Sequence, residues 1–290
     1  MKREYITRNI ALDTGDAELK RKEIKEYFNT TYELYEKLFE LLASDEVFYE
    51  QPEALRHPLI FYFGHTATFF INKLNVSKIY TKRVNDSFES IFAIGVDEMS
   101  WDDLNPNNYE WPSVESVRAY RAEVKDIVNN IIDSMDISLS IGWESPWWVI
   151  MMGIEHERIH LETSSVLIRQ LDIEHVVPEH PLWSICEEFS TQEYPQNRLL
   201  SVEAKEIVLG RDRANPRYYG WDNEFGEEKF AVAAFEASEF LVSNGEFLEF
   251  VKDGGYREES YWESEGLEWR EYKGAEHPTF WIKRDGRYFY

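Results

Sequence analysis

Two histidines, His156 and His160, are four positions apart in a stretch with the composition of one long helix. Residues four apart lie on the same face of a helix, one turn from each other. Two imidazoles in that arrangement can both bind one divalent metal ion. The surrounding residues are mainly Trp, Met, Ile, Val and Leu, so an unligated imidazole pair among them would be costly to bury. We therefore predict that this pair binds metal.

The helix that presents the pair has clear start signals. Ser145 is a good N-cap residue, and Pro146 suits the first helical position, where its missing N–H costs nothing. No further proline occurs before Leu171, and Gly153 is the one glycine in between. The sequence therefore predicts a single helix over 146–171.

The five residues His156-Glu157-Arg158-Ile159-His160 also match the zinc metalloprotease pattern, with Glu157 as general base. The third zinc ligand would then come from a later acidic residue such as Glu187 or Glu188, and no feature distinguishes either. One segment thus allows a zinc hydrolase, a metal enzyme of another class, or a metal-binding scaffold without catalysis.

A third histidine, His65, lies in the middle of an apolar, aromatic-rich helix that we expect to begin at Pro58. A lone histidine on such a helix is more often a hydrogen-bonded core residue than a ligand. The His156–His160 pair elsewhere favours the ligand interpretation here. The remaining histidines are weaker candidates: His57, His175, His180 and His277.

These histidines would be positioned by four helices, because apolar residues recur at helical spacing in four segments. The expected ranges are 16–43, 58–74, 113–133 and 146–171, with one long crossover between the second and third helix. Facing helices of such a bundle assemble metal sites in the bundle core. In this arrangement, His65 could complete a set of three ligands with His156 and His160.

The long crossover contains Lys82 and Arg83, two basic residues in an acidic protein. They could meet a substrate carboxylate, although solvated charges are the simpler interpretation.

After the fourth helix the pattern becomes short and β-like, so the predicted fold class is α+β. We expect strands at 207–210, 230–235 and 277–282 and a capped helix at 243–251. The predicted domains are 1–175 and 201–290, joined by a linker at 176–200. A turn-rich aromatic loop precedes residue 226, and we favour packing over substrate binding for its residues Tyr219, Trp221, Asp222 and Asn223.

The amino-acid composition argues against some classes of binding partner. The formal net charge of -24 argues against nucleic acid and anionic membrane surfaces, whose phosphates would be repelled. The single cysteine, Cys186, excludes an internal disulfide and fits a reducing compartment. We find no signal peptide and no apolar run long enough for a membrane span, so we expect a cytoplasmic protein.

Several stretches together resemble one enzyme family. They are HPLIFYFGHTATFFINKL, ESIFAIGVDEMSWDDL, GIEHERIHLETSSVLIRQL, YYGWDNEFG, SNGEFLEFVKDGGY and HPTFW. This combination resembles the 5-histidylcysteine sulfoxide synthases of ovothiol biosynthesis, which are related to the ergothioneine sulfoxide synthases. The resemblance implies a DinB-like four-helix bundle followed by an FGE-sulfatase domain, which is itself C-type-lectin-like.

The same resemblance implies a mononuclear non-haem Fe(II) held by His65, His156 and His160, with Glu157 in a supporting role. It implies an oxidoreductase that joins cysteine to the imidazole C5 of histidine with O2. Alternatives on the same scaffold are a different thiol or selenium donor, or ergothioneine formation from trimethylhistidine. The family's active-site tyrosine and its frequent methyltransferase domain would fall beyond residue 290, so we expect a truncated FGE-like domain and assign no catalytic side chain.

Overall fold

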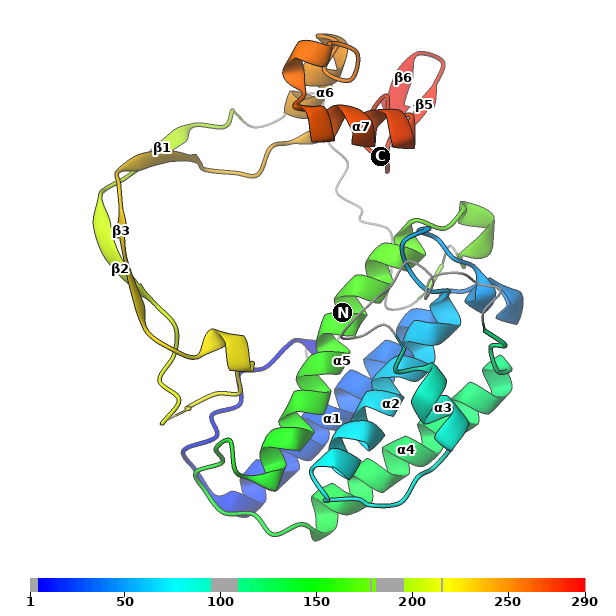
Figure 1. Ribbon diagram of the computed structural model, residues 1–290, viewed down its shortest axis with the longest axis vertical. Helices are drawn as coiled ribbons and strands as arrows, with labels where there is room; N and C mark the ends of the chain where they lie inside the picture. Colours follow the sequence, from blue (N-terminus) through cyan, green and yellow to red (C-terminus); the bar gives the residue numbers. More distant parts are fainter. Residues whose placement is uncertain (1–4, 95–108, 178, 181–195, 215, 290) are drawn as a thin grey trace. The chain divides into compact units, whose positions relative to one another are not determined.

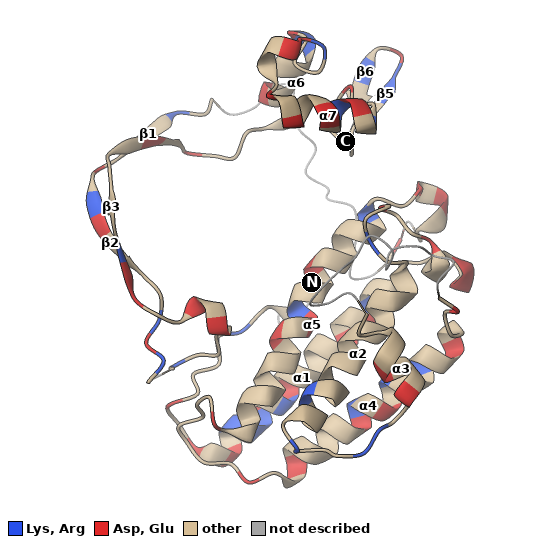
Figure 2. Ribbon diagram, viewed as in Figure 1, with Lys and Arg blue, Asp and Glu red and all other residues tan. Residues whose placement is uncertain are grey.

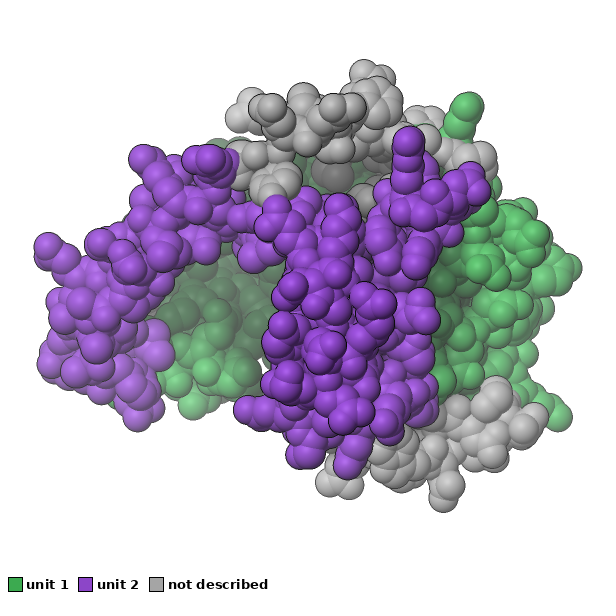
Figure 3. All heavy atoms as spheres, turned by 90° about the horizontal axis from the view of Figure 1, so that it is seen from above, with its two compact units in different colours: residues 1–185, 210–227 green, residues 186–209, 228–290 purple. Residues whose placement is uncertain are grey.

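The computed structural model describes residues 5–94, 109–177, 179–180, 196–214 and 216–289. Contacts divide the chain into two units, coloured separately in Figure 3. Unit 1 comprises Met1–Ile185 and Gly210–Glu227, and unit 2 comprises Cys186–Leu209 and Glu228–Tyr290. The domain limits predicted from the sequence remain predictions, and most of the expected linker, with Cys186, Glu187 and Glu188, lies outside the described residues.

Unit 1 is built on four long helices, as the apolar periodicity predicts (Figure 1). They are α1 (Ala17–Phe39), α2 (Leu59–Val76), α4 (Val114–Ser134) and α5 (Pro146–Arg169). A short helix, α3 (Asp86–Ile91), lies in the crossover between α2 and α4 and has no counterpart in the predictions. The 3₁₀ turns of the described chain are η2 (Asp45–Tyr49), η5 (Ile173–His175), η6 (Asp222–Glu224) and η7 (Glu259–Tyr261).

The helix starts are fixed by side-chain caps. Asp16 accepts a hydrogen bond from the Leu19 N–H, and Ser113 accepts one from the Ser116 N–H. Ser145 caps α5 by accepting from the Trp147 N–H. Each cap satisfies an amide that has no partner inside its own helix. The predicted start of the histidine-bearing helix is therefore confirmed.

Two glycines bring aromatic rings close to α2 and α5. A Cβ added at Gly64 would lie 2.5 Å from the Phe92 ring, and one added at Gly153 would lie 2.1 Å from the Phe70 ring. Both separations are far below van der Waals contact, so neither position tolerates a side chain without movement of the ring. Gly64 precedes His65 and Gly153 lies one turn before His156, so the core is closely packed beside both histidines.

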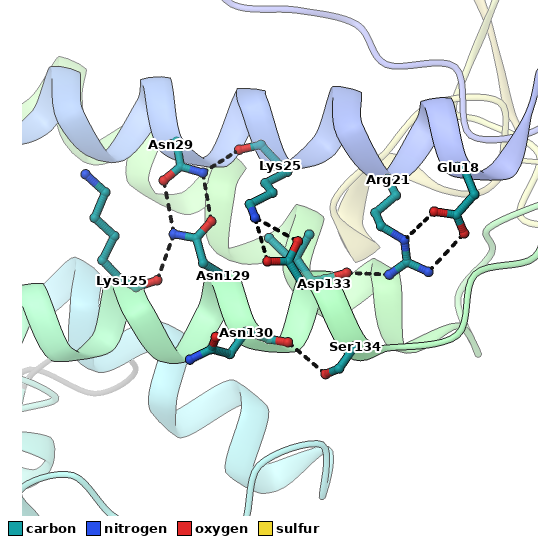
Figure 4. A network of polar contacts seen from close by, with 10 residues as sticks. Glu18, Arg21, Lys25, Asn29, Lys125, Asn129, Asn130, Asp133 and Ser134 are labelled. Atoms are coloured by element: carbon teal, nitrogen blue, oxygen red, sulfur yellow. Dashed lines mark hydrogen bonds and ion pairs between the residues drawn. The ribbon is translucent and has the colours of Figure 1, made fainter.

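Polar contacts join α1 to α4 along the side of the bundle (Figure 4). The amides of Asn29 and Asn129 exchange two hydrogen bonds of 2.8 and 3.0 Å. Lys25 pairs with Asp133 at 2.6 Å, and Arg21 donates to the Met135 carbonyl at 2.7 Å. These directional bonds fix the alignment of two helices that otherwise pack through apolar side chains.

Unit 2 contains short antiparallel pairs and two short helices (Figure 1). Strand β1 (Leu199–Val202) pairs with β4 (Phe235–Ser238), and β2 (Lys205–Leu209) pairs with β3 (Glu228–Val232). A hairpin near the end joins β5 (Ile282–Arg284) to β6 (Arg287–Phe289). The helices are α6 (Asn244–Lys252) and α7 (Ser264–Lys273). Helices followed by small antiparallel sheets confirm the α+β class.

The predicted strand at 277–282 is wrong over most of its length, because β5 begins only at Ile282. Pro278 has no N–H to donate to a strand pair, and its carbonyl instead accepts from the Trp281 N–H to close a turn. Helix α7 is absent from the predictions because its apolar residues, Leu267 and Trp269, do not form a periodic stripe.

Acidic residues are distributed over both units rather than gathered on one face (Figure 2). No helix of the described residues is long and apolar enough to cross a membrane.

Candidate metal centre

Three imidazoles meet inside unit 1. His65 comes from α2, and His156 and His160 come from successive turns of α5. One nitrogen from each ring can be chosen so that all lie within 4.8 Å of one another. The ring centroids are 5.0 Å apart for His65–His156, 4.6 Å for His65–His160 and 4.5 Å for His156–His160. The structure therefore brings together the three histidines that the sequence analysis predicts as metal ligands.

The orientation of His65 is set by the chain that follows α3. Its Nδ1 lies 2.6 Å from the carbonyl oxygen of Phe92, a residue with no exposed surface. A carbonyl can only accept, so Nδ1 of His65 holds the proton and Nε2 presents its lone pair. Phe61 stacks on the ring at a centroid separation of 5.2 Å and an interplanar angle of 16°. These contacts direct the free nitrogen of His65 toward α5.

His156 is held by stacking. Its ring lies on Phe69 with centroids 3.6 Å apart and planes 7° apart. The ammonium of Lys73 lies 5.1 Å from the centre of the same Phe69 ring. The Nε2 atoms of His65 and His156 are 3.2 Å apart. Two nitrogen ligands of one metal ion, each at about 2.0–2.1 Å, are separated by a similar distance.

Burial keeps the cluster neutral. Desolvation lowers the pKa of His65 to about 4, although the Phe92 carbonyl opposes the shift. Desolvation and the neighbouring His65 lower the pKa of His160 to about 3. The pKa of His156 also falls well below its ordinary value, because of burial and the charges that His160, His65 and Lys73 would place beside it. Neutral imidazole is the form that binds metal, so the cluster is ready for an ion near neutral pH.

The donor set fits a transition-metal ion. Within the described part of the chain, Nδ1 of His156 and Nδ1 of His160 are buried without a hydrogen-bond partner. Buried polar atoms normally have partners, so these imidazoles are not explained by their protein contacts alone. Imidazole ligands suit zinc, copper, iron and nickel, and three of them leave coordination positions open. His57, His175, His180 and His277 are not members of this group.

Glu157 points into the bundle core rather than toward a substrate. Its side chain has no exposed surface, and Oε1 accepts from Arg121 at 3.1 Å and from Thr66 at 3.1 Å. Burial raises the pKa of Glu157, while Arg121 and Thr66 oppose that change. A metalloprotease base has to reach a water molecule on the metal, so this enclosed ion pair disfavours the zinc protease hypothesis.

Sequence reasoning overlooked Arg121, which is completely buried in α4. The signal was present, because Arg121 is four residues after Val117 and three before Val124, on the apolar stripe of its helix. An arginine on such a stripe needs buried partners.

The two basic residues proposed for substrate binding lie outside the imidazole group. Arg83 donates to Asn72 at 2.7 Å and to the buried carboxylate of Glu89 at 2.8 Å. Lys82 is exposed. Their assignment to substrate binding therefore remains a prediction, and Arg83 already has a structural role at the start of α3.

The aromatic loop packs onto the bundle within unit 1. Tyr219 lies 5.0 Å from Trp148 of α5, and Trp221 stands nearly perpendicular to Tyr219 at 5.3 Å. Asp222 and Asn223 belong to η6 and are exposed. The loop also borders a cavity of about 210 Å³ together with Glu155 of α5. The contacts of Tyr219 and Trp221 agree with the packing role favoured from the sequence, whereas exposed Asp222 and Asn223 show no such packing.

Comparisons with known proteins agree with this architecture. Residues 27–164, which span most of the four long helices, match the family model of the DinB superfamily. This match contains all three imidazoles of the cluster.

Individual proteins with similar sequences include two named for ergothioneine biosynthesis and one hercynine oxygenase. The chain is 28% identical over 228 residues to ergothioneine biosynthesis protein 1 of Neurospora crassa, covering 73% of this chain and 25% of that protein. It is 25% identical over 240 residues to the protein of the same name from Schizosaccharomyces pombe, covering 71% of this chain and 30% of that protein. It is also 36% identical over 75 residues to hercynine oxygenase of Mycobacterium tuberculosis, which is 26% of this chain and 17% of that protein.

The chain is thus distantly homologous to ergothioneine biosynthesis protein 1 and to hercynine oxygenase, and it spans less than a third of the length of these relatives. The resemblance to sulfoxide synthases is supported in this broader form.

Proposed function

We propose that this chain is the metal-binding part of an Fe(II)- and O2-dependent sulfoxide synthase of the ergothioneine type. The observation that supports it is the convergence of His65, His156 and His160 in a domain whose relatives are named for ergothioneine biosynthesis and hercynine oxygenation. These names favour a trimethylhistidine substrate over free histidine.

The proposed reaction replaces an imidazole C–H bond and a thiol S–H bond with a C–S bond. One oxygen atom of O2 ends on sulfur and the other leaves as water, so O2 accepts four electrons from the two substrates. Bound iron would supply the O2 chemistry and hold the donor sulfur as thiolate. The three imidazoles would hold the ion and leave its remaining positions to substrates.

Other side chains of the site support this role. Phe61, Phe69 and the Phe92 carbonyl keep the rings of His65 and His156 oriented. Lys73, whose ammonium lies 5.1 Å from the Phe69 ring centre, places positive charge near the imidazoles and could attract a substrate carboxylate. On the family resemblance, we infer that unit 2 belongs to an FGE-sulfatase-like domain.

The second candidate is 5-histidylcysteine sulfoxide formation, which the joint set of sequence stretches favours. It differs from the first in the imidazole substrate and its reacting carbon, and in the thiol donor. A scaffold that binds metal without catalysis is the non-enzyme alternative.

The test begins with anaerobic Fe(II) titration of the chain. Oxygen uptake is then measured with cysteine or another thiol, together with either histidine or trimethylhistidine, and the products are weighed by mass spectrometry. A sulfoxide formed only from trimethylhistidine supports the ergothioneine-type function, and one formed from histidine supports the second candidate. Iron bound without oxygen uptake fits both a metal-binding part that does not turn over by itself and the scaffold, and absence of iron binding rejects the metal centre.

A further inference from the structure

One buried arginine contacts every other long helix of the bundle. From α4, Arg121 approaches Glu36 of α1 at 3.5 Å and donates to the Phe63 carbonyl of α2 at 2.8 Å. It also donates to Thr66 of α2 at 2.8 Å and to Glu157 of α5 at 3.1 Å. Helix α4 provides none of the imidazoles, so these contacts join the two ligand-bearing helices through a third helix.

The partners of Arg121 are adjacent to the candidate ligands in the chain. Thr66 directly follows His65, and Glu157 directly follows His156 and precedes His160 by three residues. Thr66 also donates to Glu157 at 3.1 Å, which closes a triangle of hydrogen bonds between α2, α4 and α5. We call Thr66, Arg121 and Glu157 the positioning cluster.

The positioning cluster is an unusual means of stabilising a bundle. The side chains of Arg121 and Glu157 both have no exposed surface, and taking such a pair out of water is unfavourable. Apolar side chains of similar volume commonly stabilise a core as well or better. What hydrogen-bonded charges supply in addition is direction, because their strength depends steeply on distance and angle.

Apolar contacts set how closely the helices approach, as the Phe70 ring of α2 does against Gly153 of α5. The hydrogen bonds of the positioning cluster add a separate constraint on the alignment of α2 along α5. A slide by one residue, about 1.5 Å, would break the bonds of the positioning cluster and change the separations of the imidazole nitrogens.

We propose that Thr66, Arg121 and Glu157 are positioning residues that set the alignment of α2 against α5, and thereby the separation of His65 from His156 and His160. This inference rests on the proposed metal centre. In this inference, Glu157 affects metal binding by positioning the neighbouring imidazoles. Arg121 affects metal affinity in the same way, although its helix, α4, carries no ligand.

The test uses Co(II) as the probe, because its visible absorption reports both affinity and ligand geometry. In the complete chain, the double variant Arg121→Met with Glu157→Leu removes both charges and keeps an apolar core of similar volume. We expect it to fold, as judged by helical circular dichroism and cooperative unfolding. We expect it to bind Co(II) at least about 10-fold more weakly than the unmodified chain, with altered absorption bands.

A matched control is Glu155→Gln. It removes a carboxylate that also adjoins His156 in sequence but contacts Tyr27 rather than Arg121. If Glu157 acted only through its negative charge near the metal, the control would weaken Co(II) binding as well. A positioning role predicts that the control binds Co(II) with nearly unchanged affinity.

If the double variant does not fold, Thr66→Val and Glu157→Gln provide the same test, because each removes part of the triangle while keeping its shape. A folded variant with the affinity and spectrum of the unmodified chain would overturn the inference. An unmodified chain that binds neither Co(II) nor Fe(II) would instead reject the metal centre, and the positioning role with it.

Discussion

The two units differ most in what they bury. Unit 1 encloses aromatic and aliphatic side chains from all four long helices, among them Phe28, Phe70 and Trp147. In unit 2, Val251 and Trp281 are the large apolar side chains that reach a buried state among the described residues. Leu241 and Phe235 of unit 2 are 94% and 49% exposed. Unit 1 therefore has the core that a rigid metal site needs, and unit 2 does not supply one on its own.

The largest effect should come from a matched pair of core and surface substitutions. Phe70→Ala in unit 1 should destabilise the bundle by about 3–5 kcal/mol, because it empties the space against Gly153 and Phe28. Phe235→Ala in unit 2 should cost less than about 1 kcal/mol. Urea denaturation followed by helical circular dichroism measures both. Similar losses for the two variants would contradict the contrast between the units.

A second comparison separates the histidines of the two units. His160→Ala should lower Fe(II) affinity by more than about 100-fold, since loss of a supporting partner alone costs 10–100-fold. His277→Ala in unit 2 should leave affinity unchanged. Anaerobic titration gives both values, and the metal-induced rise in melting temperature should vanish only for His160→Ala. Full iron stoichiometry in His160→Ala would contradict the hypothesis that the three histidines bind the metal.

The smallest effect is a pH dependence confined to unit 1. The folded pKa of about 4 for His65 and about 3 for His160 lies below the ordinary value of 6.5. Between these values the unfolded chain binds more protons than the folded one, so stability falls as pH decreases below 6.5. From pH 7 to 5.5 we expect the metal-free bundle to lose roughly 1.2 kcal/mol for each of His65 and His160, about 2.5 kcal/mol together.

The check is urea denaturation of the metal-free chain at several pH values. His65→Gln should reduce the dependence without abolishing it, because glutamine does not titrate while His156 and His160 still do. A slope that persists unchanged in this variant would assign the effect to other groups.

Much of unit 1 could be predicted from sequence because its signals are local. Ser145, Pro146 and the apolar stripes define the long helices, and the spacing of His156 and His160 identifies the ligand pair. The contact between the Phe92 carbonyl and His65 could not be predicted, because 27 positions separate the two residues.

Unit 2 was harder to predict. Its strands are 3 to 5 residues long, too short for a reliable period-two pattern, and their side chains are largely exposed. Arg121 was also missed, since the meaning of a charged residue on an apolar stripe depends on Glu157 and Thr66 in other helices.

The short separation between His65 and His156 has a consequence for how fast an ion can enter. With its proton on Nδ1, His65 can only accept at Nε2, so in the metal-free protein the 3.2 Å contact is a hydrogen bond donated by Nε2–H of His156. An incoming ion must displace that proton, and His156 must change tautomer or release it. Metal capture is therefore a proton-exchange event, and its rate should show a solvent deuterium isotope effect.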